Sequence, residues 1–182
     1  MDKRRAITVA GVAQLEEAGL GSFTQARVAQ RAGLRQSHLT YYFPTRSDLI
    51  VAVADEAVAA RVEALRPVGE AGEPGAKVAA LAAVLTAPGQ TRVLLALTQS
   101  AEDEPGVRRA LGDLAAGVAP GSVALLAAFG AAATASAIGL LQSVSTGMAV
   151  LALAREPGEF RPLAERMLTD FLTHLPPSDA EQ

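Results

Sequence analysis

Residues 24–49 read TQARVAQRAGLRQSHLTYYFPTRSDL, and this stretch decides the fold expected for the chain. Thr24 is a favourable N-cap residue, so a short helix is predicted over residues 25–32. Gly33 then supplies a turn, and a second helix is predicted over residues 36–42. Two short helices joined by a glycine-containing turn are typical of a helix-turn-helix, whose second helix fits the major groove of DNA.

The two helices are expected to divide their residues between a packed face and an exposed face. Val28 and Ala29 turn inward, and Leu34 and Leu39 anchor the second helix to the core. Ala29 and Gly33 suit a close crossing of the two helices, because larger side chains there would push the pair apart. The other residues of the second helix that can form hydrogen bonds are expected to face outward: Gln36, Ser37, His38, Thr40 and Tyr41.

Further helices flank this unit. A helix over residues 3–18 places four residues on one face, and these are Ile7, Ala10, Gly11 and Leu15. Asp48 can cap the amide of Thr45 in a capping-box pattern, which opens a fourth helix over residues 46–65. The helix-turn-helix therefore lies between two longer helices.

Composition separates a second part of the chain from the first. Residues 66–75 hold two prolines and three glycines and are predicted to be a linker. Later helical stretches are predicted over residues 77–86, 90–101, 107–117, 131–154 and 160–174. We therefore expect an all-α fold with a helix-turn-helix DNA-binding domain in residues 1–48 and a second helical domain in residues 49–182, connected by the fourth helix.

Charge is unevenly distributed, although the whole chain has a formal net charge of −3. The first fifty residues hold seven lysines and arginines against four acids, which suits contacts with phosphates. Gln14, Glu16 and Glu17 interrupt the apolar part of the N-terminus too early for a signal peptide, so a cytoplasmic location is expected. The sequence has no cysteine, metal-ligand cluster, nucleophile elbow or phosphate loop, so we predict neither an enzyme nor a bound cofactor or metal.

The helix-turn-helix resembles the N-terminal domain of the TetR family of transcriptional regulators. That family has a threonine capping the second helix, then Ile-Ala-x-x-Ala-Gly-Val, then a Leu-Tyr-x-Tyr-Phe segment followed by a basic residue and a leucine. This chain has Thr24, VAQRAGL at residues 28–34 and LTYYFPTRSDL at residues 39–49. The resemblance implies that Thr24, Tyr42 and Arg46 contact phosphates.

The resemblance also implies how the bases are read. Contacts with base edges are expected from Gln36, Ser37, His38 and Tyr41. Arg4 or Arg5 would reach the adjacent backbone or the minor groove. Two alternatives stay open, a core role for Tyr42 and a bystander role for His38, whereas Phe43 is expected in the core.

The chain departs from the family pattern on the surface that would read DNA. The family usually has Ser-Lys-Gly where this chain has Arg35-Gln36-Ser37, and often tyrosine where it has Thr40. Arg35 takes the place of a good N-cap residue, so it is expected to contact a phosphate or a base instead. The operator sequence therefore cannot be transferred from a relative.

Residues 114–154 contain no charged residue, which raises the alternative of a membrane-spanning segment. Pro120 and Gly121 are expected to interrupt this tract, Gln142 lies in its middle, and no aromatic belts flank it. A helix that is apolar on all sides is buried in a soluble protein, so core and subunit interface are the favoured interpretation.

In the TetR family the last two helices of each subunit form a four-helix dimer interface, here residues 131–154 and 160–174. The interface candidates are Ala132, Gly139, Ser143, Gly147, Leu163, Met167 and Phe171. Their small members would permit close helix crossing, or would serve only packing within the chain. A two-fold dimer presents its recognition helices about 34–36 Å apart, so the operator is expected to be a palindrome.

The resemblance further implies an effector pocket among the helices of the second domain. Its candidate residues are Leu81, Leu85, Leu94, Leu97, Thr98, Leu140, Leu141, Val144 and Met148. With few charges and aromatics available, the expected small-molecule effector is apolar or weakly polar.

The sequence thus predicts a ligand-responsive transcriptional regulator, by default a repressor, that binds double-stranded DNA as a homodimer and is released by its effector. The alternative is a helical interaction protein of the same fold that does not bind DNA, which predicts no salt-dependent DNA binding.

Overall fold

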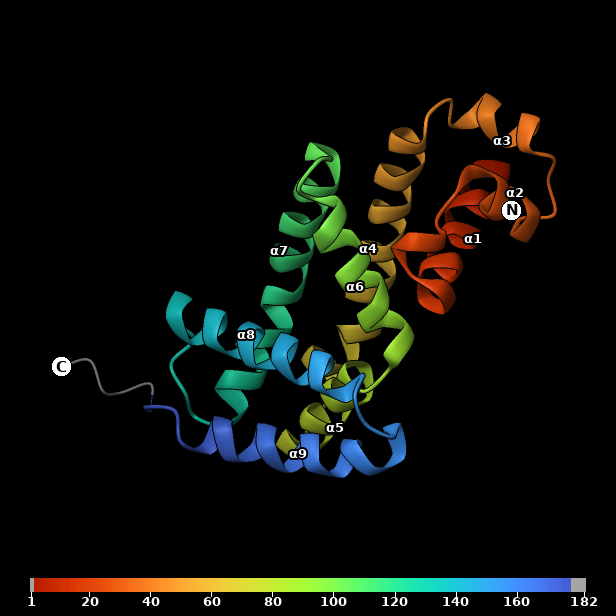
Figure 1. Cartoon of the computed structure of the whole chain (residues 1–182). Coiled ribbons are helices and arrows are strands. Elements are labelled where there is room, and N and C mark those ends of the chain that lie inside the picture. Colours follow the sequence, from red (N-terminus) through yellow and green to blue (C-terminus); the bar gives the residue numbers. More distant parts are fainter. Residues whose placement is uncertain (1, 178–182) are drawn as a thin grey trace. The chain divides into compact units, whose positions relative to one another are not determined.

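The computed structural model describes residues 2–177, and this part of the chain is all-helical, as predicted (Figure 1). Its α-helices are α1 (Lys3–Ala18), α2 (Gln25–Arg31), α3 (Gln36–Tyr42), α4 (Arg46–Glu70), α5 (Pro74–Leu85), α6 (Pro88–Ser100), α7 (Pro105–Ala128), α8 (Ala135–Ala152) and α9 (Pro157–Thr173). A short 3-10 helix, Leu20–Ser22, follows α1.

The chain divides into two compact units. The first unit comprises residues 1–61 together with 89–115, and the second comprises residues 62–88 together with 116–182. The boundaries of these units fall inside α4, after the first residue of α6, and inside α7. The functional division after residue 48 rests on the end of the helix-turn-helix motif and stays a prediction.

In the first unit, α1 and α4 approach each other closely. A Cβ on Gly11 would lie 2.3 Å from Cγ2 of Val53, so only glycine fits this position without a shift. Ile7 and Leu15, on the same face of α1, are fully buried, and Ala10 is buried as well. This confirms the predicted inner face of the first helix.

The fourth helix is longer than predicted, because α4 continues to Glu70 through the first half of the expected linker. The side chain of Lys77, which is buried, donates from Nζ to the carbonyls of Val68 at 3.1 Å and Gly69 at 2.8 Å. These donors satisfy carbonyl groups that a helix leaves free at its C-terminus. The connection to α5 is reduced to residues 71–73.

Four prolines mark helix starts that the sequence analysis places too late. Pro74, Pro88, Pro105 and Pro157 are the first residues of α5, α6, α7 and α9. Proline is favourable there because the first turn of a helix needs no N–H donor and the fixed φ angle of proline suits it. The predicted helices begin two or three residues downstream of these prolines.

The predicted break at Pro120 is also wrong, since α7 continues through it. A Cβ on Gly117 would lie 2.7 Å from Cγ2 of Val62, and a Cβ on Gly121 would lie 3.9 Å from the backbone nitrogen of Gly69. The two glycines, one helical turn apart, thus let α7 pack closely on the last turns of α4. This packing offsets the single helical hydrogen bond that a proline cannot donate.

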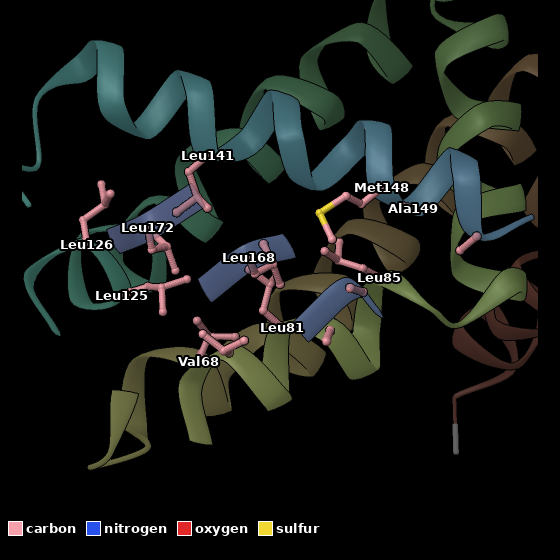
Figure 2. Close-up of a cluster of buried hydrophobic side chains, with 14 of the residues drawn as sticks. Val68, Leu81, Leu85, Leu125, Leu126, Leu141, Met148, Ala149, Leu168 and Leu172 are labelled. Carbon is pink, nitrogen blue, oxygen red and sulfur yellow. The ribbon is translucent and has the colours of Figure 1, made fainter. Parts of the chain in front are cut away.

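The second unit has an aliphatic core (Figure 2). Its largest buried side chains come from α5, α7, α8 and α9 and include Leu81, Leu85, Leu125, Leu126, Leu141, Met148, Phe160, Leu168 and Leu172. In Figure 2, leucines of α9 and α5 face the side chains that α8 contributes. The nearly aromatic-free composition therefore yields a core built of leucine and alanine.

Two described helices, α7 and α8, are long and apolar enough to cross a membrane by length and composition, and the bent pair of α5 and α6 would add a third. One face of α8 is nevertheless used for packing. Leu141, Met148 and Ala149 on this helix are buried in the core of the second unit.

Candidate nucleic-acid interface

The helix-turn-helix starts and turns where the sequence predicts. Thr24 caps α2, because its hydroxyl oxygen accepts a hydrogen bond from the amide of Arg27 at 3.2 Å. Gly33 has φ +68°, and the next amide, of Leu34, donates to the carbonyl of Ala29 at 2.9 Å. A Cβ on Gly33 would meet nothing within 4 Å, so this glycine serves the turn and not the predicted close helix crossing.

The recognition helix α3 is fixed by its buried residues and by one hydrogen bond that sequence reasoning missed. Leu39 and Phe43 are buried as predicted, whereas Leu34 is only half-buried. Gln25, the first residue of α2, donates from Nε2 to the carbonyl of Phe43 at 2.8 Å. This bond ties the start of α2 to the end of α3, and no sequence pattern signals it.

The exposed face of α3 carries hydrogen-bonding side chains. Gln36, Ser37, His38 and Tyr41 are exposed, and Tyr41, at 81%, is the most exposed of the large hydrophobic residues that the structure describes. Thr40 is half-buried, and its hydroxyl donates to the carbonyl of Ser37 at 3.1 Å, so it is partly occupied within the helix. The face that the sequence predicts for base contacts is therefore mostly free to form hydrogen bonds.

Arg35 lies at the N-cap position of α3 and makes no side-chain capping bond. Its side chain is exposed, next to the polar face of the recognition helix. This placement agrees with the expectation that Arg35 does not serve as a cap.

Aromatic residues at the end of α3 combine core and surface roles. Phe43 is 1% exposed, and the guanidinium of Arg4 lies 4.8 Å from the centre of its ring. Tyr42 is half-buried and packs edge-on against Tyr41, with ring centres 5.2 Å apart. Arg4 is thereby held beside the end of the recognition helix.

Arg46, the first residue of α4, lies beside the start of α2. Its Nε donates to the carbonyl of Phe23 at 3.4 Å, and its guanidinium lies 5.7 Å from the centre of the Phe23 ring. Since Thr24 follows directly in the chain, the hydroxyl of Thr24 and the exposed guanidinium of Arg46 belong to one surface. These are two of the groups predicted to contact phosphates.

Two other arginines are engaged by acids of the same unit. Arg5 forms an ion pair of 3.5 Å with Glu56, whose carboxylate also accepts a hydrogen bond from the hydroxyl of Thr8 at 3.2 Å. Arg31 forms hydrogen bonds with Glu17, and these lower the pKa of Glu17 and raise the pKa of Arg31. Arg4 is therefore the freer of the two arginines predicted to reach the DNA backbone.

The capping box at the start of α4 forms as predicted. The amide of Thr45 donates to Asp48 Oδ2 at 3.0 Å, and the amide of Asp48 donates to the Thr45 hydroxyl at 3.0 Å. Hydrogen bonds from the Thr45 hydroxyl and amide lower the pKa of Asp48. Ser47 donates to the carboxylate of Glu104, which lies just before α7, so the first turn of α4 is joined to the loop between α6 and α7.

The nine predicted pocket residues are divided between the two units. Leu81, Leu85, Leu141 and Met148 are core residues of the second unit, and Val144 packs against them. Leu140 and Thr98 are exposed. Leu94 and Leu97 belong to the first unit, where they line a separate cavity of about 40 Å³.

The predicted interface residues all belong to the second unit. Gly139, Ser143 and Gly147 are exposed on α8, and Met167 is exposed on α9. Leu163 and Phe171 are half-buried, and so is Ala132, which precedes α8 because this helix begins at Ala135 and not at residue 131. A Cβ on Gly139 or Gly147 would meet nothing within 4 Å, so packing within the chain does not require glycine at either position.

Solved structures with the same fold cover nearly the whole chain. A transcriptional regulator from Rhodococcus sp. Rha1 matches with a TM-score of 0.76 and 19% identity over 95% of this chain and 99% of the other. A TetR transcription regulator from Haloarcula marismortui matches with a TM-score of 0.74 and 20% identity over 96% and 98%. The multidrug binding protein EbrR, complexed with proflavin, matches with a TM-score of 0.62 and 23% identity over 93% and 99%.

At the level of sequence, no curated protein matches the chain. Residues 7–53 match the family model described as bacterial regulatory proteins, tetR family. This segment contains the inner face of α1, the helix-turn-helix and the first turns of α4. Residues 7–53 are therefore similar to the tetR family of bacterial regulatory proteins, and nearly the whole chain shares the fold of these solved structures.

Proposed function

We propose that this protein is a ligand-responsive transcriptional regulator that binds a palindromic DNA operator as a homodimer. The observation that carries the proposal is the exposed face of α3, on which Gln36, Ser37, His38 and Tyr41 present hydrogen-bonding groups. A slim helix of this kind reads base edges in the major groove. By default we expect the protein to act as a repressor that the effector releases from its operator. The expected location is the cytoplasm.

Phosphate contacts would be supplied by groups that flank this face. Arg46 and Thr24 lie together at the start of α2, Arg4 lies over Phe43, and Tyr42 ends α3 with a half-buried ring. Contacts with phosphates fix the orientation of the protein on the duplex, whereas contacts with bases select the sequence. Regulation of transcription through DNA binding, and not catalysis, is the activity that this arrangement supports.

Homodimerisation is proposed through α8 and α9. The exposed side of α8 carries no charge and combines small residues with Leu140, Val150 and Leu151, which are 41–50% exposed. Gly139 and Gly147 cost helix stability, about 1 kcal/mol each relative to alanine, although a Cβ at either position would meet no group of the described residues within 4 Å. A second copy of the same helix crossing closely at these glycines would account for both features.

Effector release requires a connection between a ligand site and the DNA-binding helices. The hydrogen bond from Ser47 to Glu104 joins the first turn of α4 to the loop after α6. Movement of α6 on ligand binding would therefore shift the start of α4, next to Arg46. EbrR, which has the same fold, is described in complex with proflavin, and this supports a small-molecule effector for this chain as well.

The DNA-binding proposal is tested by selecting sites from random double-stranded DNA and measuring their affinity by fluorescence anisotropy over a KCl series. Arg46→Gln should weaken binding to all sequences and reduce the salt slope by about one unit. Gln36→Ala should instead relax the base preference, costing about 1–3 kcal/mol at one position. Tyr42→Phe removes only a hydroxyl and keeps the fold.

Arg66→Gln is the matched control, because Arg66 is exposed on the same helix as Arg46 but is paired with Glu63 and Glu70. Its affinity and salt slope should equal those of the wild type. The proposal fails if no sequence is enriched, or if Arg46→Gln and Tyr42→Phe bind the selected site as the control does.

The dimer is tested by sedimentation of Gly139→Ala against Gly112→Ala. Both glycines lie inside helices, and neither would place a Cβ within 4 Å of another group in this chain. Only Gly139→Ala should weaken self-association. A monomeric wild type, or equal association of the two variants, would contradict the proposed interface.

A further inference from the structure

The first unit contains a cavity that lies partly within the DNA-binding domain itself. The cavity is lined by side chains from α1, α4, α6 and α7. Val12 on α1 and Leu114 on α7 mark two of its walls, and Leu94 and Leu97 on α6 form a third. All of these residues belong to one compact unit.

The polar group that distinguishes this cavity is the guanidinium of Arg61 on α4. Arg61 donates to Gln90 Oε1 at 2.9 Å, and both residues line the cavity. Within residues 2–177, Arg61 forms no ion pair with a carboxylate, unlike Arg5, Arg31, Arg66, Arg109 and Arg161. Its positive charge is therefore shared with a neutral amide only.

The position of Arg61 is unfavourable for its positive charge. Burial lowers the pKa of Arg61, because desolvation penalises the charged form. An arginine side chain stays charged in proteins and offers five N–H donors in a planar fork. The Arg61 side chain is half-buried, so its charge is only partly solvated, and a carboxylate that enters the cavity would supply the missing counter-ion.

The remaining walls decide what the rest of the ligand must be. Ala57, Val58 and Val93, together with the leucines of α6 and α7, present aliphatic carbon. The volume of about 40 Å³ corresponds to roughly three water molecules at ~10–15 Å³ for each water. It therefore suits a carboxylate with a short aliphatic chain.

We propose that the cavity between α1, α4, α6 and α7 binds a small aliphatic carboxylate, whose carboxylate group pairs with Arg61. Glu16 also lines the cavity, and its negative charge opposes a second carboxylate on the ligand, so a monoanion is favoured over a dianion. The binding step stands on the cavity alone. Its effect on DNA rests on the proposed function.

The site is placed to influence the DNA-binding helices. Arg92 on α6 donates to the backbone carbonyl of Glu16 at 3.1 Å, and a Cβ on Gly89 would lie 3.3 Å from Cβ of Glu16. The start of α6 is thus seated on the last turn of α1. A ligand between α1 and α6 would alter this contact, and α1 packs directly on α2.

Binding is tested on the full-length protein by isothermal titration calorimetry with acetate, propionate and butyrate, and with butyramide and butylammonium as probes of charge. Saturable binding of at least one carboxylate is expected, with butyramide and butylammonium at least about tenfold weaker. Butyramide or butylammonium binding as tightly as butyrate, or no binding of any carboxylate at millimolar concentration, would overturn the proposal.

Variants locate the site. Arg61→Gln should weaken carboxylate binding by about tenfold or more, because it removes a charged hydrogen bond, while Arg66→Gln should leave binding unchanged. Leu94→Phe should block the cavity without touching Arg61, and its matched control is Leu95→Phe, an exposed position on the same helix. Circular dichroism checks that each variant folds. Equal binding by Leu94→Phe and Leu95→Phe would place the carboxylate elsewhere and refute the assignment.

A second measurement separates this inference from the proposed function. The anisotropy of the selected DNA site is recorded with and without butyrate for the wild type and for Leu94→Phe. Butyrate should change the affinity of the wild type alone. If the protein binds butyrate through Arg61 but binds no DNA, the proposed function fails and the carboxylate site stands.

Discussion

Replacing Gly11 with alanine tests how closely α1 must pack on α4. The added Cβ would lie 2.3 Å from Cγ2 of Val53 and 3.4 Å from its Cγ1. Val53 is fully buried and β-branched, so it has few alternative rotamers with which to make room. Overpacking costs about 1–3 kcal/mol, and replacing a glycine inside a helix by alanine returns about 1 kcal/mol. The free energy of unfolding should therefore fall by about 0–2 kcal/mol.

Urea unfolding at one fixed protein concentration measures this change, and a double-mutant cycle isolates its cause. In a Val53→Ala background the conflicting methyl groups are absent, so Gly11→Ala should stabilise by about 1 kcal/mol. Gly112→Ala, inside α7 with free space around the new Cβ, should stabilise the otherwise unchanged protein by a similar amount of about 1 kcal/mol. If Gly11→Ala is equally stabilising with Val53 and with alanine at that position, the close contact of α1 and α4 does not explain the glycine.

Three further predictions concern single hydrogen-bonded groups. Lys77→Met should lower the free energy of unfolding by about 1–3 kcal/mol, since two helix-end carbonyls lose their donor, whereas Lys3→Met should change it by less than about 0.5 kcal/mol in the same urea titration. Asp48 has a lowered pKa in the folded protein, so its contribution to stability is present above the ordinary aspartate pKa of about 3.9 and is lost as pH falls through the folded value. The stability difference between wild type and Asp48→Asn should therefore be present at pH 7 and vanish in acid, and a pH-independent difference would contradict this origin. Gln25→Leu should cost about 1 kcal/mol and weaken DNA binding, because the bond to the Phe43 carbonyl that fixes α3 is lost; unchanged affinity would show that α3 is held without it.

The helix-turn-helix could be predicted closely because its ends are determined by local chemistry. The N-cap at Thr24, the positive φ angle at Gly33 and the capping box of Asp48 each act within a few residues of their own position. The last residue of α2 differs from the prediction by one residue, and α1 and α3 have the predicted bounds. Patterns of this range are visible in the sequence without knowledge of the fold.

The bounds of the later helices were less predictable, because distant residues decide them. α4 extends to Glu70 with the help of Lys77, and α7 passes through Pro120 because glycines let it pack on α4. Neither contact can be inferred from the residues near the helix end alone. The helix starts at prolines are hard to predict as well. A proline in the first turn of a helix and a proline in a loop cannot be told apart from the neighbouring residues alone.

The candidate ligand site was even harder to predict from the sequence, because its residues are also far apart in the chain. The sequence predicts that Leu94 and Leu97 line a pocket, but it groups them with residues that lie in the core of the other unit. The sequence does not reveal a role for Arg61, because an arginine on a long helix is usually solvated. Its partner Gln90 is 29 residues away. The residues proposed to read DNA lie in one continuous segment, where their spacing makes them recognisable in the sequence. The residues that would bind a ligand come from four helices. They can be recognised as a site only in the folded structure, where a guanidinium without an ion pair among the described residues lies among aliphatic side chains.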